Sequence, residues 1–245
     1  MSPTSAQPRR APELEEAHPC YDCAVRLQSV CGVLESDELR AFRQSGANAT
    51  IEAGQTLFYE GDEAANVYNL THGTLRLSKL LPDGRRQIAG FLFPGDFLGI
   101  TMEEEHAFTA EAVSGADLCR FPRVRFDDFV EAHPHLERRL YALAAHELAA
   151  ARRQLVLLGR KTAAERVASF LLMLAGRLDP EGGLTDDDEI LLPMSRNDIA
   201  DYLGLRIETV SRELGALKAA RLIQLTGTHK IRLIARDQLE ALAEG

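Results

Sequence analysis

The sequence predicts an α+β protein, in which an antiparallel barrel or sandwich is followed by helices and a small wing. Three observations predict this class. Short apolar runs alternate with turn residues between Ala49 and about Phe121, the apolar period becomes helical after Pro134, and two short helices flank a glycine turn further on. The 245 residues, 45% of them hydrophobic, are enough for one large core or two modest ones. We expect two domains.

Turn residues at regular spacing delimit the strands of the first domain, for example Gly61, Gly73 and Gly95. The segments between them alternate apolar and polar residues, which is typical of an antiparallel barrel or sandwich. The segment from Leu75 to Gln87 is expected to form a hairpin with Pro82-Asp83-Gly84 at its tip.

The segment from Pro134 to Arg160 is predicted to form one long helix. Six of its side chains recur at spacings of three and four, which makes a narrow apolar seam of the kind that two parallel helices share. They are Tyr141, Ala144, Leu148, Ala151, Leu155 and Leu158. Two interpretations stay open, a dimer contact or packing on the chain's own barrel, because an amphipathic stripe is common to both.

The remaining helices form a second unit. A helix is predicted from Thr162 to Leu178, before a loop rich in Pro, Gly and Asp over residues 179–189. A short helix from Ser195 to Tyr202, a turn at Gly204 and a helix over residues 206–219 then follow. This order is that of a helix-turn-helix.

Local signals support the ends of this unit. Ser195 is well placed as a helix N-cap, with Asp198 three residues later as a weaker relative of the capping-box Glu. Residues 222–225 and 230–234 are predicted to form a two-stranded wing, joined by Thr226-Gly227-Thr228.

The net charge of −9 argues at first sight against a nucleic-acid partner, since binding to phosphates needs Lys and Arg. The charge is unevenly distributed. Between Met194 and Arg236 there are eight basic and four acidic residues, whereas the run 186–189 is entirely acidic. The C-terminal segment therefore carries a local positive field.

The chain is expected to be cytoplasmic, without a membrane partner. It contains no apolar run of membrane-spanning length, and residues Met1 to Pro12 lack the apolar stretch of a secretory signal. In the cytosol thiols stay reduced, so cysteines there are metal ligands or redox sensors more often than disulfides.

The chain has only four cysteines, Cys20, Cys23, Cys31 and Cys119. Thiolates are soft ligands, and four of them at one point hold an iron-sulfur cluster or a structural zinc ion. This interpretation requires the fold to bring Cys119 to the other three. The alternative places Cys119 in the barrel core and leaves the three N-terminal cysteines to zinc.

Three stretches together resemble the CRP/FNR superfamily of bacterial transcription regulators, and within it the oxygen-responsive Fnr-type regulators of alphaproteobacteria. They are His18-Pro19-Cys20-Tyr21-Asp22-Cys23, Gly159-Arg160-Lys161-Thr162-Ala163-Ala164-Glu165-Arg166 and Ile207-Glu208-Thr209-Val210-Ser211-Arg212. The resemblance implies a cyclic-nucleotide-binding-like β-roll, a long dimerisation helix and a winged helix-turn-helix. The implied domains are a cysteine arm (1–35), the β-roll (36–134), the dimerisation helix (135–160) and the DNA-binding domain (161–245).

The same resemblance implies a function. All four cysteines would hold a [4Fe-4S] cluster that controls homodimerisation, so that the dimer binds double-stranded DNA at TTGAT-N4-ATCAA palindromes when oxygen is low. The rival within this family is a regulator whose cysteines bind zinc or sense oxidation directly. RNA polymerase is implied as a partner of the exposed barrel loops, including the tip at residues 82–84 and residues near Ser114.

Glu208, Ser211 and Arg212 are the expected base readers. They project from one face of the second helix, because they stand at positions i, i+3 and i+4. An Arg can bind guanine O6 and N7, and a Glu can accept from the cytosine amino group. Without the surrounding motif, a solvated salt bridge between Glu208 and Arg212 would be the better explanation. Thr209 belongs to the same interface, and Arg196, Arg206 and Lys218 are expected to contact phosphates.

Cyclic nucleotide is not expected to bind. The stretch from Gly99 to Ala112 has no Arg to pair with the phosphate, and the three glutamates 103–105 would repel it. No enzyme is expected either. A thiol-disulfide enzyme is the rival from that class, but Cys20 and Cys23 lack the βαβ context that such a Cys-x-x-Cys motif needs.

Overall fold

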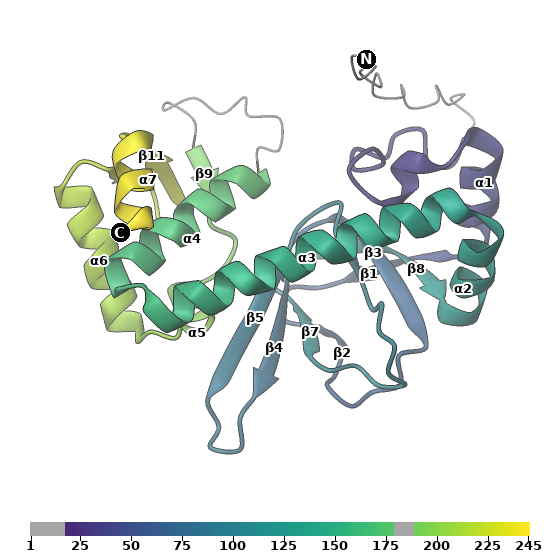
Figure 1. Cartoon of the computed structure of the whole chain (residues 1–245), viewed down its shortest axis with the longest axis horizontal. Coiled ribbons are helices and arrows are strands. Elements are labelled where there is room, and N and C mark those ends of the chain that lie inside the picture. The colour runs from purple at the N-terminus through teal and green to yellow at the C-terminus, as the bar shows by residue number, and fades with distance from the viewer. Residues whose placement is uncertain (1–17, 179–188) are drawn as a thin grey trace, which may run out of the picture.

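The computed structural model describes residues 18–178 and 189–245 and divides into two units joined by a long helix (Figure 1). That helix, α3 (Pro134–Arg160), has the bounds that the sequence predicts. The beginning of the predicted cysteine arm and the acidic residues 186–188 lie outside the described residues. Within residues 18–178 and 189–245, no helix has the length and apolar character needed to cross a membrane.

The first unit is a β-roll of two four-stranded antiparallel sheets. The first sheet has the order β1-β8-β3-β6 and the second β2-β7-β4-β5. The strands are β1 (Ala47–Ile51), β2 (Thr56–Phe58), β3 (Asn66–His72), β4 (Leu75–Leu80), β5 (Arg86–Leu92), β6 (Phe97–Leu98), β7 (Thr109–Ala112) and β8 (Ala116–Pro122). Buried side chains from both sheets, among them Leu70, Leu75 and Leu118, form the core between them.

The predicted hairpin is confirmed as β4 and β5. Its last strand pair is Leu80 with Arg86, and the Leu81 N–H donates to the Arg85 carbonyl at 2.8 Å. Gly84 has a φ of 83°, a conformation that side chains with a Cβ rarely adopt, which explains a glycine at this tip. The hairpin is long and projects from the roll (Figure 1).

Helices cover the outer face of the first sheet. They are the short 3-10 helix η1 (Val30–Val33), α1 (Ser36–Gln44), α2 (Arg123–Ala132) and the first half of α3. Phe42 of α1 stacks on Phe121 of β8 with ring centroids 4.2 Å apart, and Val30 and Leu136 are buried in the same cluster. This outer core fastens the N-terminal segment to both the sheet and α3.

The second unit contains the helix-turn-helix and the wing. Its helices are α4 (Ala163–Leu178), α5 (Arg196–Leu203), α6 (Ile207–Ala219) and α7 (Arg236–Glu244), and its sheet has the order β10-β11-β9. Strands β10 (Ile223–Leu225) and β11 (Lys230–Leu233) confirm the predicted wing, to which β9 (Glu189–Leu191) adds an unpredicted third strand.

The local signals of the helix-turn-helix are confirmed. The Ser195 side chain caps α5 by accepting from the Asp198 N–H. The Asp198 side chain in turn accepts from the Ser195 N–H, which completes a capping box. Gly204 ends α5 with a φ of 61°, in the left-handed region that favours glycine. These two signals fix where α5 begins and where it ends.

Candidate functional site

The fold brings the cysteine arm to the outer face of the first sheet. Cys20, Cys31 and Cys119 all pack against the core that contains Phe42 and Phe121. All four thiols are free and partly buried. Cys20 interacts electrostatically with Cys23 and Cys119, and Cys31 interacts with the other three. The fold therefore places the cysteines of the arm next to Cys119 of β8, although the two segments are far apart in the sequence.

Hydrogen bonds shape the arm around its cysteines. The buried His18 accepts from the Cys20 N–H through Nδ1 at 3.0 Å, so its Nε2 donates to the Ser36 carbonyl at 3.1 Å. The fully buried Ser29 accepts from the Cys31 N–H at 3.2 Å and donates to the Arg26 carbonyl at 3.1 Å. Each contact fixes the backbone beside one cysteine.

The thiols are not activated for redox catalysis. Burial raises the pKa of Cys20 to about 11, and the neighbouring Cys23 and Cys119 add to the rise. Burial also raises the pKa of Cys31 to about 12 and raises the pKa of Cys119. Reactive cysteines have a lowered pKa, because the thiolate is the nucleophile. At neutral pH these three thiols are protonated unless a metal displaces the proton.

The four thiols are soft donors, which suit zinc and an iron-sulfur cluster alike. In the described part of the chain, no three His, Cys, Asp or Glu side chains form a group that could hold a metal ion. A zinc ion needs every ligand within about 2.3 Å of one point, whereas a [4Fe-4S] cluster takes its four thiolates on a larger body. Positive charge lies nearby, since Arg43 and Arg26 offset part of the rise in the pKa of Cys20, and Arg43 offsets part of that of Cys119.

The arm also contacts α3 directly. Arg139 of α3 donates to the Gln28 carbonyl at 2.7 Å, and Leu136 is fully buried beside Val30 and Leu34. These contacts connect the cysteine arm to α3 without passing through the roll. No local sequence pattern indicates this route.

The predicted seam of α3 is largely exposed in the single chain. Tyr141 is 78% exposed, Leu148 53% and Leu155 72%. Ala144 and Ala151 are exposed as well. Leu158 differs, because it is half-buried against the core of its own DNA-binding unit. Most of the seam therefore does not pack on the chain's own barrel, which removes one of the two interpretations that the sequence left open.

The recognition helix α6 lies at the outer edge of the second unit, away from the roll (Figure 1). Glu208 and Arg212 are exposed, while Thr209 and Ser211 are half-exposed. Arg212 pairs with Glu213, with Nη2 and Oε1 3.0 Å apart, rather than with Glu208. The face that was expected to read bases is open to a partner.

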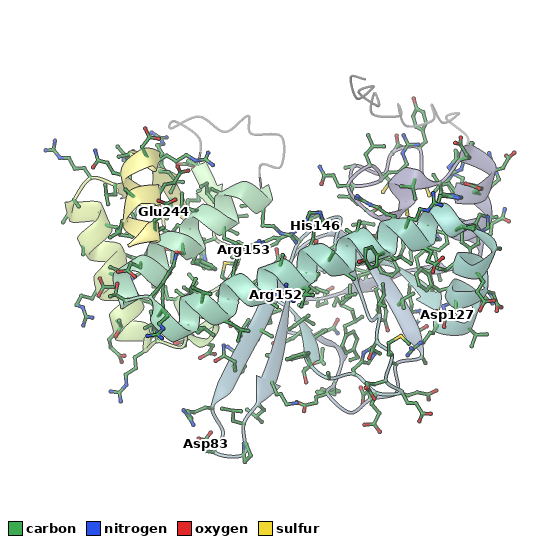
Figure 2. The ribbon with its side chains drawn as sticks, in the orientation of Figure 1. Asp83, Asp127, His146, Arg152, Arg153 and Glu244 are labelled. Carbon is green, nitrogen blue, oxygen red and sulfur yellow. The ribbon has the colours of Figure 1, made fainter. Side chains whose placement is uncertain are left out.

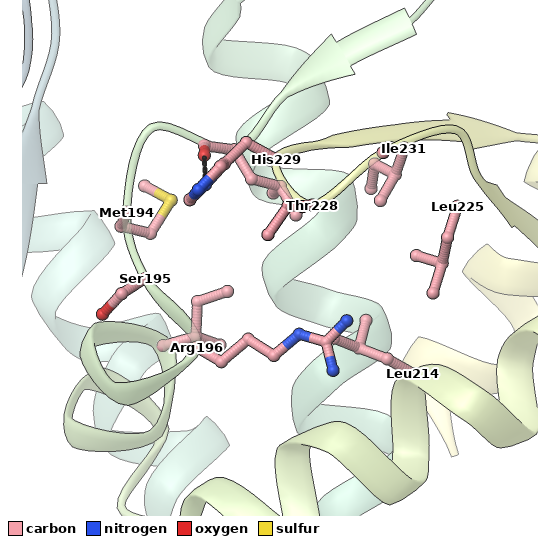
Figure 3. A pocket seen from close by; sticks show the side chains of 11 residues that line it. Met194, Ser195, Arg196, Leu214, Leu225, Thr228, His229 and Ile231 are labelled. Atoms are coloured by element: carbon pink, nitrogen blue, oxygen red, sulfur yellow. Dashed lines mark hydrogen bonds between the residues drawn. The ribbon is translucent and has the colours of Figure 1, made fainter.

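The expected phosphate contacts differ in their surroundings. Arg206, the N-cap residue of α6, and Lys218, in its last turn, are both exposed. Arg196 is half-buried instead, and it donates to Ser211 Oγ at 3.4 Å. It lies along a cavity of about 180 Å³ between the helix-turn-helix and the wing, lined also by Met194, Leu214 and His229 (Figure 3). Arg196, in the first turn of α5, therefore contacts the side chain of Ser211 on the recognition helix α6.

Aromatic side chains join the aliphatic core of the roll. Phe58 stacks on His106 with ring centroids 3.6 Å apart, and the ring of Tyr68 lies 6.0 Å from that of Phe58. The loop with the three glutamates is held by Arg123, which donates to the carbonyls of Thr101 and Glu103. Sequence reasoning missed this Arg, because it lies outside the stretch from Gly99 to Ala112.

Two family models match the chain. A cyclic nucleotide-binding domain matches residues 49–133, and a Crp-like helix-turn-helix domain matches residues 165–242. Among solved structures, the chain is similar to FixK2 from Bradyrhizobium japonicum, with a TM-score of 0.75 and 37% identity over 80% of this chain and 96% of that one. The fold class that the sequence predicts is confirmed by these matches.

Curated relatives align over nearly the whole chain. The chain is 46% identical to the nitrogen fixation regulation protein FixK of Bradyrhizobium diazoefficiens, over 92% of this chain and 94% of the relative. It is 37% identical to the transcriptional activator protein FnrL of Cereibacter sphaeroides, over 93% of this chain and 92% of the relative.

Proposed function

Because the chain belongs to the CRP/FNR family of DNA-binding transcription regulators, we propose that it senses oxygen through a [4Fe-4S] cluster and binds FNR-type palindromes when oxygen is low. The predicted family and the prediction that the chain is not an enzyme are confirmed by relatives named as regulators and activators. The observation that carries the finer proposal is that Cys20 and Cys31 of the arm pack with Cys119 of β8 against one core, with Cys23 as an electrostatic neighbour. The test is whether protein purified without air binds this palindrome and releases it in air.

Cys20, Cys23, Cys31 and Cys119 would hold the cluster, which supplies sensitivity to oxygen when bound. The raised pKa values of three of these thiols speak against the rival in which free cysteines sense oxidation, since protonated thiols react slowly.

Ligation would fix the arm in place. With Cys119 on β8 and three ligands on the arm, the arm is held against both the sheet and α3, where Arg139 and Leu136 contact it. Loss of ligation frees the arm, so the first half of α3 loses packing partners. We expect α3 to be less well ordered and the dimer to be weaker in that state.

Dimerisation would use the exposed seam of α3. Regulators of this family are dimers, and apolar side chains such as Leu148 and Leu155 need a partner to leave water. Two parallel α3 helices would place two α6 helices on one two-fold axis, where they can reach successive major grooves of a palindrome. The pair then binds far more tightly than one subunit alone.

Other partners follow from the same function. The hairpin tip projects into solvent, with Asp83 at its end (Figure 2), and RNA polymerase is the partner that we assign to this loop and to the region of Ser114. The exposed glutamates 103–105 favour a regulator without cyclic nucleotide, because they would repel its phosphate. Its DNA targets place its action in the cytoplasm.

Replacement of Arg212 by Ala is expected to weaken binding to the palindrome by about 1–3 kcal/mol and to relax discrimination at one base pair, because two hydrogen bonds to a guanine are lost. Lys218→Ala is the matched control, since a phosphate contact carries no sequence information and its loss weakens all sequences alike. Competition binding with each base pair of one half-site replaced in turn measures both effects. Equal discrimination by the two variants would contradict base reading by Arg212.

A further inference from the structure

The β4–β5 hairpin of the roll is also part of the DNA-binding unit. Ile88 and Phe91 of β5, with the nearby Phe93, are buried in the same core as the helices of that unit. The ring of Tyr202 on α5 lies 5.4 Å from that of Phe91. In Figure 1, β5 reaches α5 beneath α3. The hairpin thus contacts the helix that precedes the recognition helix.

Five side chains of alternating charge cross this contact, and we call them the charge chain. Arg76 of β4 binds Glu111 of β7 and also donates to Asp198 Oδ1 of α5 at 2.8 Å. Arg86 of β5 donates to the same Asp198 oxygen at 2.7 Å. Its Nε donates to Asp201 Oδ2 at 2.9 Å. The Asp198 side chain is only 5% exposed and that of Arg76 15%, so the pair that they form is shielded from water and salt.

Asp198 joins the charge chain to the start of α5. Its Oδ1 accepts from the two arginines, while its Oδ2 accepts from the Ser195 N–H at 3.0 Å and from the Ser195 hydroxyl at 2.7 Å. Burial alone would raise the pKa of Asp198, but Ser195, Arg76 and Arg86 hold it below its ordinary value. The carboxylate is therefore charged at neutral pH. The hairpin is fastened to the first turn of α5.

The covalent joint between the units is short. Only Lys161 and Thr162 separate α3 from α4. Arg166 of α4 donates to the carbonyls of Leu158 and Lys161, each at 2.9 Å. It also donates to the carbonyl of Leu203, at the end of α5, at 2.9 Å. One end of α5 is thus held by the joint and the other by the charge chain.

We propose that the charge chain sets the angle between the recognition helix and the dimer axis, and thereby the half-site spacing that the dimer accepts. A helix held at both ends cannot turn, and α6 packs directly on α5 through the helix-turn-helix. The reading face of α6 stays exposed, so the hairpin orients the DNA-binding unit without covering it. A DNA-binding unit that is already oriented loses less conformational entropy when it binds DNA. It also discriminates more strongly between half-site spacings. The proposal rests on the proposed function as a DNA-binding dimer.

The test compares two palindromes, one with the four-base-pair spacer and one with a single base pair added. The addition separates the half-sites by about 3.4 Å and rotates them by about a tenth of a turn. Arg86→Gln removes the contacts to both acidic residues of α5, and Asp201→Asn weakens only the outer end of the charge chain. Arg85→Gln is the matched control, because Arg85 is exposed and pairs with Asp83 on the hairpin itself. Anaerobic protein is used throughout, and sedimentation verifies that each variant is dimeric.

Wild type and Arg85→Gln are expected to bind the longer palindrome at least about tenfold more weakly than the shorter one. In Arg86→Gln this preference falls below about threefold, and Asp201→Asn lies between. The proposal is overturned if both variants keep the preference of the control, or if they bind both palindromes more tightly, since the hairpin would then restrain the unit in a non-binding orientation. Failure of wild type to bind either palindrome would overturn the proposed function instead.

Discussion

Replacement of Cys119 by Ser removes iron from protein purified without air and lowers its affinity for the palindrome by about a hundredfold or more. The magnitude follows from the loss of the dimer, because simultaneous contact with two half-sites contributes about 10²–10⁴ in affinity. Serine has nearly the same shape as cysteine but is a hard oxygen ligand that holds an iron-sulfur cluster poorly. Iron content, acid-labile sulfide and DNA affinity are measured on the same sample.

Asp117→Asn is the matched control for this variant. Asp117 lies two residues away on the same strand, is exposed, and contacts Thr50 and His72 rather than the arm. The control is expected to keep its iron and its affinity. A Cys119→Ser variant that still binds the palindrome as wild type does, with the same response to air, would contradict the role of Cys119.

Replacement of Leu148 by Glu is expected to raise the dissociation constant of the dimer by about a hundredfold or more. Two equivalent Leu side chains lose burial worth about 1.5–3 kcal/mol each, which corresponds to about 10²–10⁴ in affinity. A two-fold axis also places the two introduced carboxylates near each other, where they repel. Sedimentation equilibrium of anaerobic protein measures the constant.

Arg153→Glu is the control for Leu148→Glu. Arg153 is exposed and lies on the opposite side of α3, because each residue turns the helix by about 100°. It introduces the same side chain into the same helix away from the seam, so we expect an unchanged dimer. If Leu148→Glu dimerises as tightly as this control, the subunits meet through another surface.

Elements with strong local signals could be predicted from the sequence. The period of α3, the Ser195 and Asp198 capping box and the Gly204 turn depend on neighbouring residues, and each is found where the sequence predicts it. Helices α1, α2 and α7 were missed, because segments of nine or ten residues give few repeats of the helical period. Strand β9 was missed because three residues carry almost no alternation.

The sequence predicts that the arm cysteines and Cys119 come together, but it does not predict the contacts around them. Four cysteines in a reduced compartment indicate a shared ligand, and this requires no knowledge of the intervening chain. The contacts of Arg76 and Asp198 join residues 122 positions apart, and no local pattern indicates such a pair. The same holds for Arg139 and Gln28, 111 positions apart, which join α3 to the arm. Tertiary packing alone creates these contacts.

The most direct test of oxygen control is one titration of anaerobic protein with air, followed by cluster absorbance and by fluorescence of a labelled palindrome. Wild-type protein is predicted to contain four iron and four sulfide per chain, about the content of one [4Fe-4S] cluster, and to release the DNA as the absorbance falls. Protein that contains zinc or no metal, or that keeps the palindrome after the absorbance is lost, would contradict the account.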